Sequence, residues 1–173
     1  MRFYVRDRYL PRRQAQQRGS AAVEFALLLI PLLLLSFGIV EYGRALYQYN
    51  TLVKSVRASV RLLSSQSPDS DTYASLINQA RCLAVYGNVD CLGVALAPNL
   101  STAQVKICDR KSWSQCTGAT QESYRSVPTG WGTINLVTVK IEGYVFSFIG
   151  LPMVTTGPSM TFGAIQAVMR QAG

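Results

Sequence analysis

The chain has 173 residues, a formal net charge of +8 and no histidine. Residues 1–19 contain six arginines and one acid and so carry +5, whereas the rest of the chain carries +3. Basicity concentrated in one short segment argues against a nucleic-acid-binding protein. The absence of histidine excludes His-based catalysis and most metal sites. The sequence also offers no close carboxylate pair and no phosphate-binding glycine motif, so we expect neither an enzyme nor a cofactor.

The N-terminal region predicts a single membrane anchor. Residues 20–40 contain one charged side chain, Glu24. As a helix they would be about 31 Å long, enough to cross the hydrocarbon core of a bilayer. The arginines that precede this run place the N-terminus in the cytosol. We therefore expect a basic cytosolic leader over 1–19, a transmembrane helix over 20–40, an amphipathic extension over 41–64 and an extracytoplasmic α+β domain over 65–173.

Glu24 is the unusual feature of this span. A carboxylate costs about 2.5–3.5 kcal/mol at the centre of a bilayer and less near its surface, and it usually marks a function. The stretch from Gly19 to Phe25 resembles the processing site of type IV prepilins, where a prepilin peptidase cuts after the glycine. Cleavage would make Ser20 the N-terminus. Glu24 of a neighbouring subunit could then neutralise the α-amine among apolar helices and favour one axial stagger between subunits.

Two other interpretations of this segment stay open. In the first, the span is a plain signal anchor, and Glu24 only lies among the lipid headgroups. In the second, it is a cleaved secretory signal, because Ser36 and Gly38 place small residues at the −3 and −1 positions of a cleavage site. The glutamate in the apolar core and the helical pattern beyond Gly38 argue against the second interpretation.

The helical pattern continues after Val40. Apolar side chains recur at alternating spacings of four and three in a stripe made of Tyr42, Leu46, Tyr49, Val53, Val56, Val60 and Leu63. We expect one helix from about Ser20 to Leu63, bent or loosened at Pro31. The stripe would pack against the chain's own domain, which we favour, or form a coiled coil. Both arrangements are possible if the domain covers only the C-terminal part of the stripe.

The remaining residues predict an α+β fold. After a polar break, Asp71 is expected to cap a second helix from Thr72 to about Tyr86, which Gly87 ends. The pattern then changes to alternation, which predicts strands over 105–108, 135–145 and 159–169. We expect these strands to form a small antiparallel sheet on the amphipathic part of the long helix.

The four cysteines all lie outside the membrane in this topology. That compartment is oxidising, so disulfides are expected. A zinc site fits the spacing poorly, because the gaps between successive cysteines contain 8, 16 and 7 residues and no histidine is present. We favour the two local pairs, Cys82–Cys91 and Cys108–Cys116, over the other two pairings. Each would close a loop of about ten residues and contribute on the order of 2–3 kcal/mol.

Several stretches together resemble the TadE-type pseudopilins, which are minor, pilin-like components of the bacterial tight-adherence (Tad) branch of type IV pili. The resemblance is specific over about residues 18–61, where it rests on Arg18–Pro31 and Gly38–Arg44. It is looser over Lys54–Arg61 and over Ala167–Arg170 near the C-terminus.

The resemblance implies cleavage by a prepilin peptidase between Gly19 and Ser20, with Glu24 and Phe25 as recognition and assembly residues. It also implies a location in the bacterial inner membrane or the pilus, with other pilins or pseudopilins and the pilus assembly machinery as partners. The major pilins of this system are very short, whereas this chain carries a sizeable C-terminal domain. A minor or tip-like pseudopilin, or a TadF- or TadG-like relative, is therefore implied rather than the bulk subunit of the filament.

An alternative from another functional class is a membrane-anchored extracytoplasmic binding module that is not part of a pilus. Its ligand face would be formed by Trp113, Trp131 and Tyr124. Exposed rings would favour this alternative, whereas buried rings would belong to the core, as we expect.

Overall fold

The computed structural model describes residues 18–149 and 159–172, so most of the predicted leader lies outside the described residues. The chain consists of two compact units, and the boundary between them follows Gly38. The helix α1, Arg18–Ser64, runs from the first unit into the second and continues through Pro31.

The described part of the first unit is the apolar beginning of α1. Within residues 18–149 and 159–172, this is the one helix long and apolar enough to cross a membrane, with a mean hydropathy of 2.5 in its best window. The side chains of that window are unburied. A row of large apolar side chains in contact with water is unstable, whereas a bilayer would cover it. The described residues therefore contain one candidate membrane-spanning helix, near the N-terminus.

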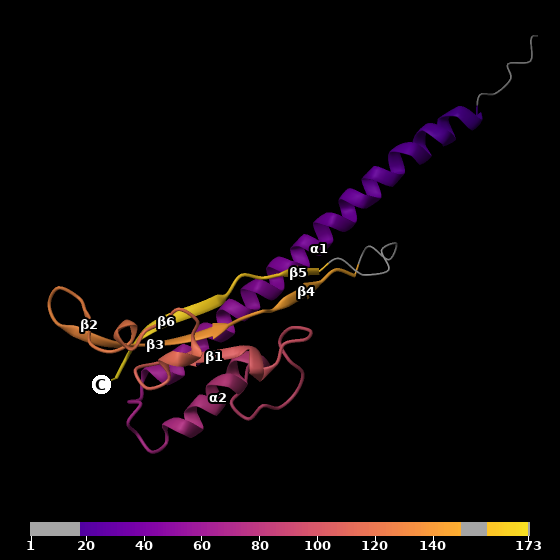
Figure 1. Ribbon diagram of the computed structural model, residues 1–173. Coiled ribbons are helices and arrows are strands. Elements are labelled where there is room, and N and C mark those ends of the chain that lie inside the picture. The colour runs from indigo at the N-terminus through magenta and orange to yellow at the C-terminus, as the bar shows by residue number, and fades with distance from the viewer. Residues whose placement is uncertain (1–17, 150–158, 173) are drawn as a thin grey trace, which may run out of the picture. The chain divides into compact units, whose positions relative to one another are not determined.

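The second unit is an α+β domain with an antiparallel sheet, as predicted. The central strand β3, Thr133–Ile141, pairs with β1, Val105–Cys108, on one side and with β6, Ile165–Gln171, on the other. The end of α1 and the second helix α2, Tyr73–Tyr86, pack on the sheet, with α2 beside β1 (Figure 1). The short strand β2, Val127–Pro128, also pairs with β3. The strands β4, Val145–Ser147, and β5, Ser159–Thr161, form a separate antiparallel pair. Three 3₁₀ helices complete the domain: η1, Thr102–Gln104; η2, Trp113–Gln115; and η3, Gln121–Ser123.

One hydrophobic core lies between the helices and the inner face of the sheet. Alternate residues of the strands point into it, as the period of two requires. The sheet contributes Val105, Ile107, Val137, Val139, Ile141 and Ile165. From the helices come Leu52, Val56, Val60, Leu63, Tyr73, Ala80, Ala84 and Val85.

The buried face of α1 differs in part from the predicted apolar stripe. Its C-terminal members Val56, Val60 and Leu63 are fully buried, which confirms that part of the pattern. Its first members are exposed: Tyr42, Leu46 and Tyr49. The face that meets the domain is rotated from the stripe and contains polar positions, namely Gln48, Ser55 and Ser59.

Hydrogen bonds explain why these polar side chains can be buried. The Ser55 hydroxyl donates to the Ala84 carbonyl of α2 at 2.9 Å, and Gln48 Oε1 accepts from the Tyr144 hydroxyl at 2.8 Å. Buried polar groups cost little free energy when they are paired in this way. The pattern of apolar residues therefore identified the covered C-terminal part of the helix but missed the polar positions on its buried face.

Three further boundaries differ from the prediction. The N-cap of α2 is Thr72 rather than Asp71, although Gly87 ends the helix as expected with φ +73°. The strand predicted over 135–145 ends at Ile141, because the chain turns at Gly143 with φ +69°. The strand predicted over 159–169 is divided into β5 and β6.

The outer face of the sheet carries a second, smaller cluster. Cys108 and Leu136 point away from the main core and pack with Cys116, Tyr124, Trp113 and Ala119. The segment between β1 and β2 therefore covers part of this face, and the domain is layered as helices, sheet and disulfide-bonded loop.

Candidate functional site at the start of the long helix

The predicted processing residues all lie in the first turns of α1. Gly19, Ser20, Glu24 and Phe25 are exposed. The Ser20 hydroxyl donates to Glu24 Oε1 at 3.2 Å, because residues four apart face each other on a helix. The structure thus brings Ser20 and Glu24 together on one face. The carboxylate has this hydroxyl as a local partner at the polar end of an otherwise apolar run.

Glycine at position 19 has no packing reason in the described structure. A Cβ atom added there would meet nothing within 4 Å, and Gly19 is the second residue of α1. Its φ angle is not positive, so the backbone does not require glycine either. A requirement for glycine here would therefore come from an interaction outside the fold, such as recognition by a processing enzyme.

A second polar group lies in the part of α1 that belongs to the domain. Arg44 Nη2 donates to Glu41 Oε2 at 2.7 Å and to the Ser147 carbonyl of β4 at 2.5 Å. Its guanidinium carbon lies 4.6 Å from the centre of the Phe146 ring, in a cation–π arrangement. Arg44 therefore joins the helix to the β4–β5 pair. From the sequence, Arg44 was noted only as part of a family motif. Its contact with Ser147 could not be predicted, because the two residues are 103 positions apart.

The four cysteines form two disulfides, in the two local pairs that were favoured from the sequence. Cys82 at the end of α2 is bonded to Cys91, and Cys108 at the end of β1 is bonded to Cys116. The Cα atoms are 4.7 Å and 6.1 Å apart, respectively. With all four cysteines in disulfides, none is left as a thiolate ligand for zinc. The second bond holds the loop that covers the outer face of the sheet.

The three aromatic residues proposed as one ligand face do not form one. Tyr124 is buried and Trp113 is half-buried against the Cys108–Cys116 cluster, so both belong to the core as expected. Trp131 differs, because it lies in the turn between β2 and β3 and is fully exposed. Two glycines flank it, Gly130 with φ +85° and Gly132.

One buried carboxylate was not predicted from the sequence. Asp109 directly follows β1 and has no exposed surface. The sequence signal was weak, since an acid at a strand end usually faces water.

These features define a protein whose described residues comprise a candidate membrane-spanning helix that continues into a disulfide-bonded α+β domain. Residues 19–61 match the model of the family described as TadE-like protein. This confirms the resemblance over that segment, which contains Gly19, Ser20, Glu24, Phe25 and nearly all of α1. No curated protein matches the chain, and no solved structure matches it.

Proposed function

We propose that this protein is a minor pseudopilin of a bacterial Tad pilus, needed for pilus assembly and adhesion. A prepilin peptidase would cut it between Gly19 and Ser20. The mature protein would span the inner membrane once, with its α+β domain on the periplasmic or extracellular side. Other pilins and the assembly machinery would be its partners, and it would have no enzymatic activity.

The observation that carries this proposal is the position of Gly19, Ser20 and Glu24 at the start of the candidate span. The family match covers the same segment, which supports a role in the Tad system. The lack of a packing reason for Gly19 supports a recognition role for it. The long helix that leads into a small sheet supports a pilin-like assembly through α1.

Glu24 would act in assembly after the cut. The new α-amine of Ser20 is largely cationic at neutral pH. In the uncut chain the Ser20 hydroxyl already lies 3.2 Å from Glu24 Oε1, so the carboxylate is placed to bind a cation at this level of the helix. A neighbouring subunit would supply its amine there when the apolar helices pack. Leaving either charge unpaired among apolar side chains would cost free energy, so the subunits would favour the one axial stagger at which the two charges meet.

Substitutions at Glu24 test this role. Glu24→Ala and Glu24→Gln should be inserted and cut like the wild type, yet recover at least about tenfold less partner pilin in pulldowns from membranes, a loss of about 1.4 kcal/mol or more. Glu24→Asp should be intermediate, and pilus counts should fall in the same order. Leu28→Ala is the matched control, because it shortens an exposed side chain one turn further on the same face.

The opposite result would favour the plain anchor. Normal assembly by cut Glu24→Ala protein would leave the carboxylate without a role in assembly. A Glu24→Leu variant separates assembly from insertion, because it is more hydrophobic and should insert at least as well. A defect of this variant in assembly could not be attributed to poor insertion.

One observation favours the binding module as a second candidate function. Trp131 at the tip of the β2–β3 hairpin is fully exposed, and exposed tryptophan is enriched at binding sites. If the domain binds a surface independently of a pilus, Trp131→Ala should reduce attachment while leaving pilus counts unchanged. Tyr47→Ala on α1 is a control that also removes an exposed ring.

A further inference from the structure

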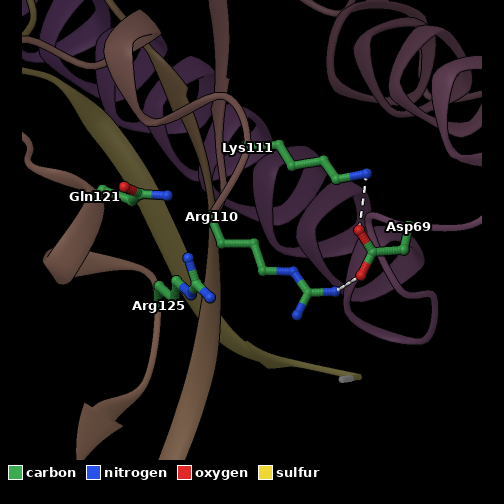
Figure 2. Close-up of a pocket in the computed structure, with 5 residues that line it drawn as sticks. All are labelled: Asp69, Arg110, Lys111, Gln121 and Arg125. Atoms are coloured by element: carbon green, nitrogen blue, oxygen red, sulfur yellow. Dashed lines mark hydrogen bonds and ion pairs between the residues drawn. The ribbon is translucent and has the colours of Figure 1, made fainter.

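A cavity lies beyond the end of β1, remote in sequence from the processing segment. Its volume is about 220 Å³, and it is lined by Asp69, Arg110, Lys111, Gln121 and Arg125. Four segments meet there: the loop between α1 and α2, the residues after β1, η3 and the turn that follows η3. In Figure 2, Arg110 lies between Asp69 on one side and Arg125 on the other.

The lining carries more positive than negative charge. Three cationic side chains and one carboxylate line the cavity, and two of the three, Arg110 and Lys111, pair with that carboxylate. Asp69 accepts a hydrogen bond from Arg110 Nη2, and its other oxygen lies 2.8 Å from Lys111 Nζ. The bond from Lys111 and the nearby Arg110 guanidinium hold the pKa of Asp69 below its ordinary value. Asp69 is therefore an anion at neutral pH and balances one of the three positive charges.

Arg110 is fixed from the side of the α1–α2 loop. Its Nη2 atom also donates to the Ser67 hydroxyl at 3.1 Å. Both bonds use the same nitrogen, and within residues 18–149 and 159–172 no acceptor is found for its other guanidinium nitrogens. The guanidinium thus keeps donors for a further acceptor.

Arg125 has no ion pair or side-chain hydrogen bond with any described residue, and neither has the Gln121 amide. Their backbone is nonetheless held in place. Arg125 N donates to the Gln121 carbonyl at 3.0 Å. Between them, buried Tyr124 accepts at its carbonyl from Leu136 N of β3 at 2.9 Å. The backbone therefore positions the free donor groups of Arg125 and Gln121 beside the Arg110 guanidinium, of which one nitrogen is already hydrogen-bonded.

We propose that this cavity binds an oxyanion: a carboxylate, phosphate or sulfate group of an anionic ligand. Arg125 and Gln121 would bind it together with the free donors of Arg110, and Lys111 would add positive charge at the rim. Guanidinium groups suit this task because their planar donors match two oxygens of one anion. The volume accommodates such a group with part of its carrier. This inference is independent of pilus assembly.

Titration of the full-length protein in detergent micelles at low ionic strength tests the proposal. Inorganic phosphate, sulfate and glucuronate are the probes, glucose is the neutral control, and calorimetry measures binding. At least one anion should bind saturably, and glucose should not. Binding of phosphate or sulfate alone would point to phosphorylated or sulfated ligands, and binding of glucuronate alone to acidic sugars. Each of these results supports an oxyanion site.

Matched variants separate a built site from general charge attraction. Arg125→Gln should weaken binding at least about tenfold without changing the thermal midpoint, since Arg125 holds nothing in place. Arg57→Gln removes the same charge from an exposed position of α1 and should leave binding within about twofold. Asp69→Asn should tighten binding severalfold, because it removes the competing carboxylate. The proposal is overturned if no anion binds saturably, or if Arg57→Gln weakens binding as much as Arg125→Gln.

Discussion

Tyr73 and Asp109 are hydrogen-bonded in the interior of the domain, with the tyrosine hydroxyl donating to Asp109 Oδ2 at 2.7 Å. Gln171 Nε2 donates to the same hydroxyl at 2.8 Å, so the bond links α2, the end of β1 and the last residue of β6. The other carboxylate oxygen accepts from the backbone of Lys111 and Ser112 at 2.7 and 2.8 Å. The network satisfies a carboxylate that has no exposed surface.

This network predicts a specific alkaline sensitivity. Burial and the Asp109 carboxylate raise the pKa of Tyr73 well above its ordinary value of 10.0. Tyr73 therefore contributes its full stability below about pH 10, and loses it above, because the unfolded chain releases the proton first. Tyr73→Phe should lower the free energy of unfolding by about 1–3 kcal/mol at pH 8, because Asp109 and Gln171 lose a partner. Its stability should then fall less steeply than that of the wild type between pH 10 and 12.

Denaturant unfolding followed by near-ultraviolet circular dichroism measures both effects. Tyr86→Phe is the control, since Tyr86 is less buried and lies on the same helix. Equal slopes for Tyr73→Phe and the wild type would contradict the assignment.

Processing is the second prediction. Mass spectrometry of protein extracted from a native membrane should find Ser20 as the N-terminus when the prepilin peptidase is present. Gly19→Val should block the cut while the protein still inserts, because the helix has room for the added atoms. Val23→Ala nearby is the control and should be cut normally. A mature protein that retained residues 1–19 would rule out this processing site.

The third prediction concerns the disulfides. Non-reducing peptide mapping of protein from its native envelope should give Cys82–Cys91 and Cys108–Cys116, as in the structure. Replacing Cys108 and Cys116 together by serine should lower stability by about 2–3 kcal/mol. Tryptophan fluorescence should shift to longer wavelength, because Trp113 packs on this cluster.

The corresponding double serine variant of Cys82 and Cys91 is the comparison for that shift. It should be destabilised to a similar extent without the change in fluorescence, since its loop carries no tryptophan. Free thiols in the native protein would refute a stabilising role for either bond.

Arg44 supplies the fourth prediction. Arg44→Ala should destabilise the domain by about 1.5–3 kcal/mol, the range for a hydrogen bond made by a charged group, here the bond to the Ser147 carbonyl. Arg44→Lys keeps the charge but loses the planar group over Phe146, and should recover only part of the loss. Thermal unfolding of both variants measures this, with Arg57→Lys on the exposed face as control. Full recovery by lysine would mean that only the charge matters.

Elements that depend on local sequence were predicted well. The long helix, α2 with its stop at Gly87, and the strand β1 all follow from the spacing of apolar residues and from one residue that tolerates a left-handed backbone. Glu24 was also found from the sequence, because a single charge in an apolar run is visible without any structure.

Contacts between distant residues were decided only by the tertiary structure. Tyr73 and Asp109 are 36 residues apart, and Asp69 and Arg110 are 41 apart. Neither pair has a local signal, because a polar side chain is equally suited to water or to a buried partner until the packing of the chain supplies one. The same reason explains the buried Gln48 and Ser55, which the apolar pattern did not include and whose burial hydrogen bonds to other elements made possible. The sequence by itself thus determined the candidate membrane-spanning helix and the types of element. The packing of α1, α2 and the sheet decided which polar groups meet.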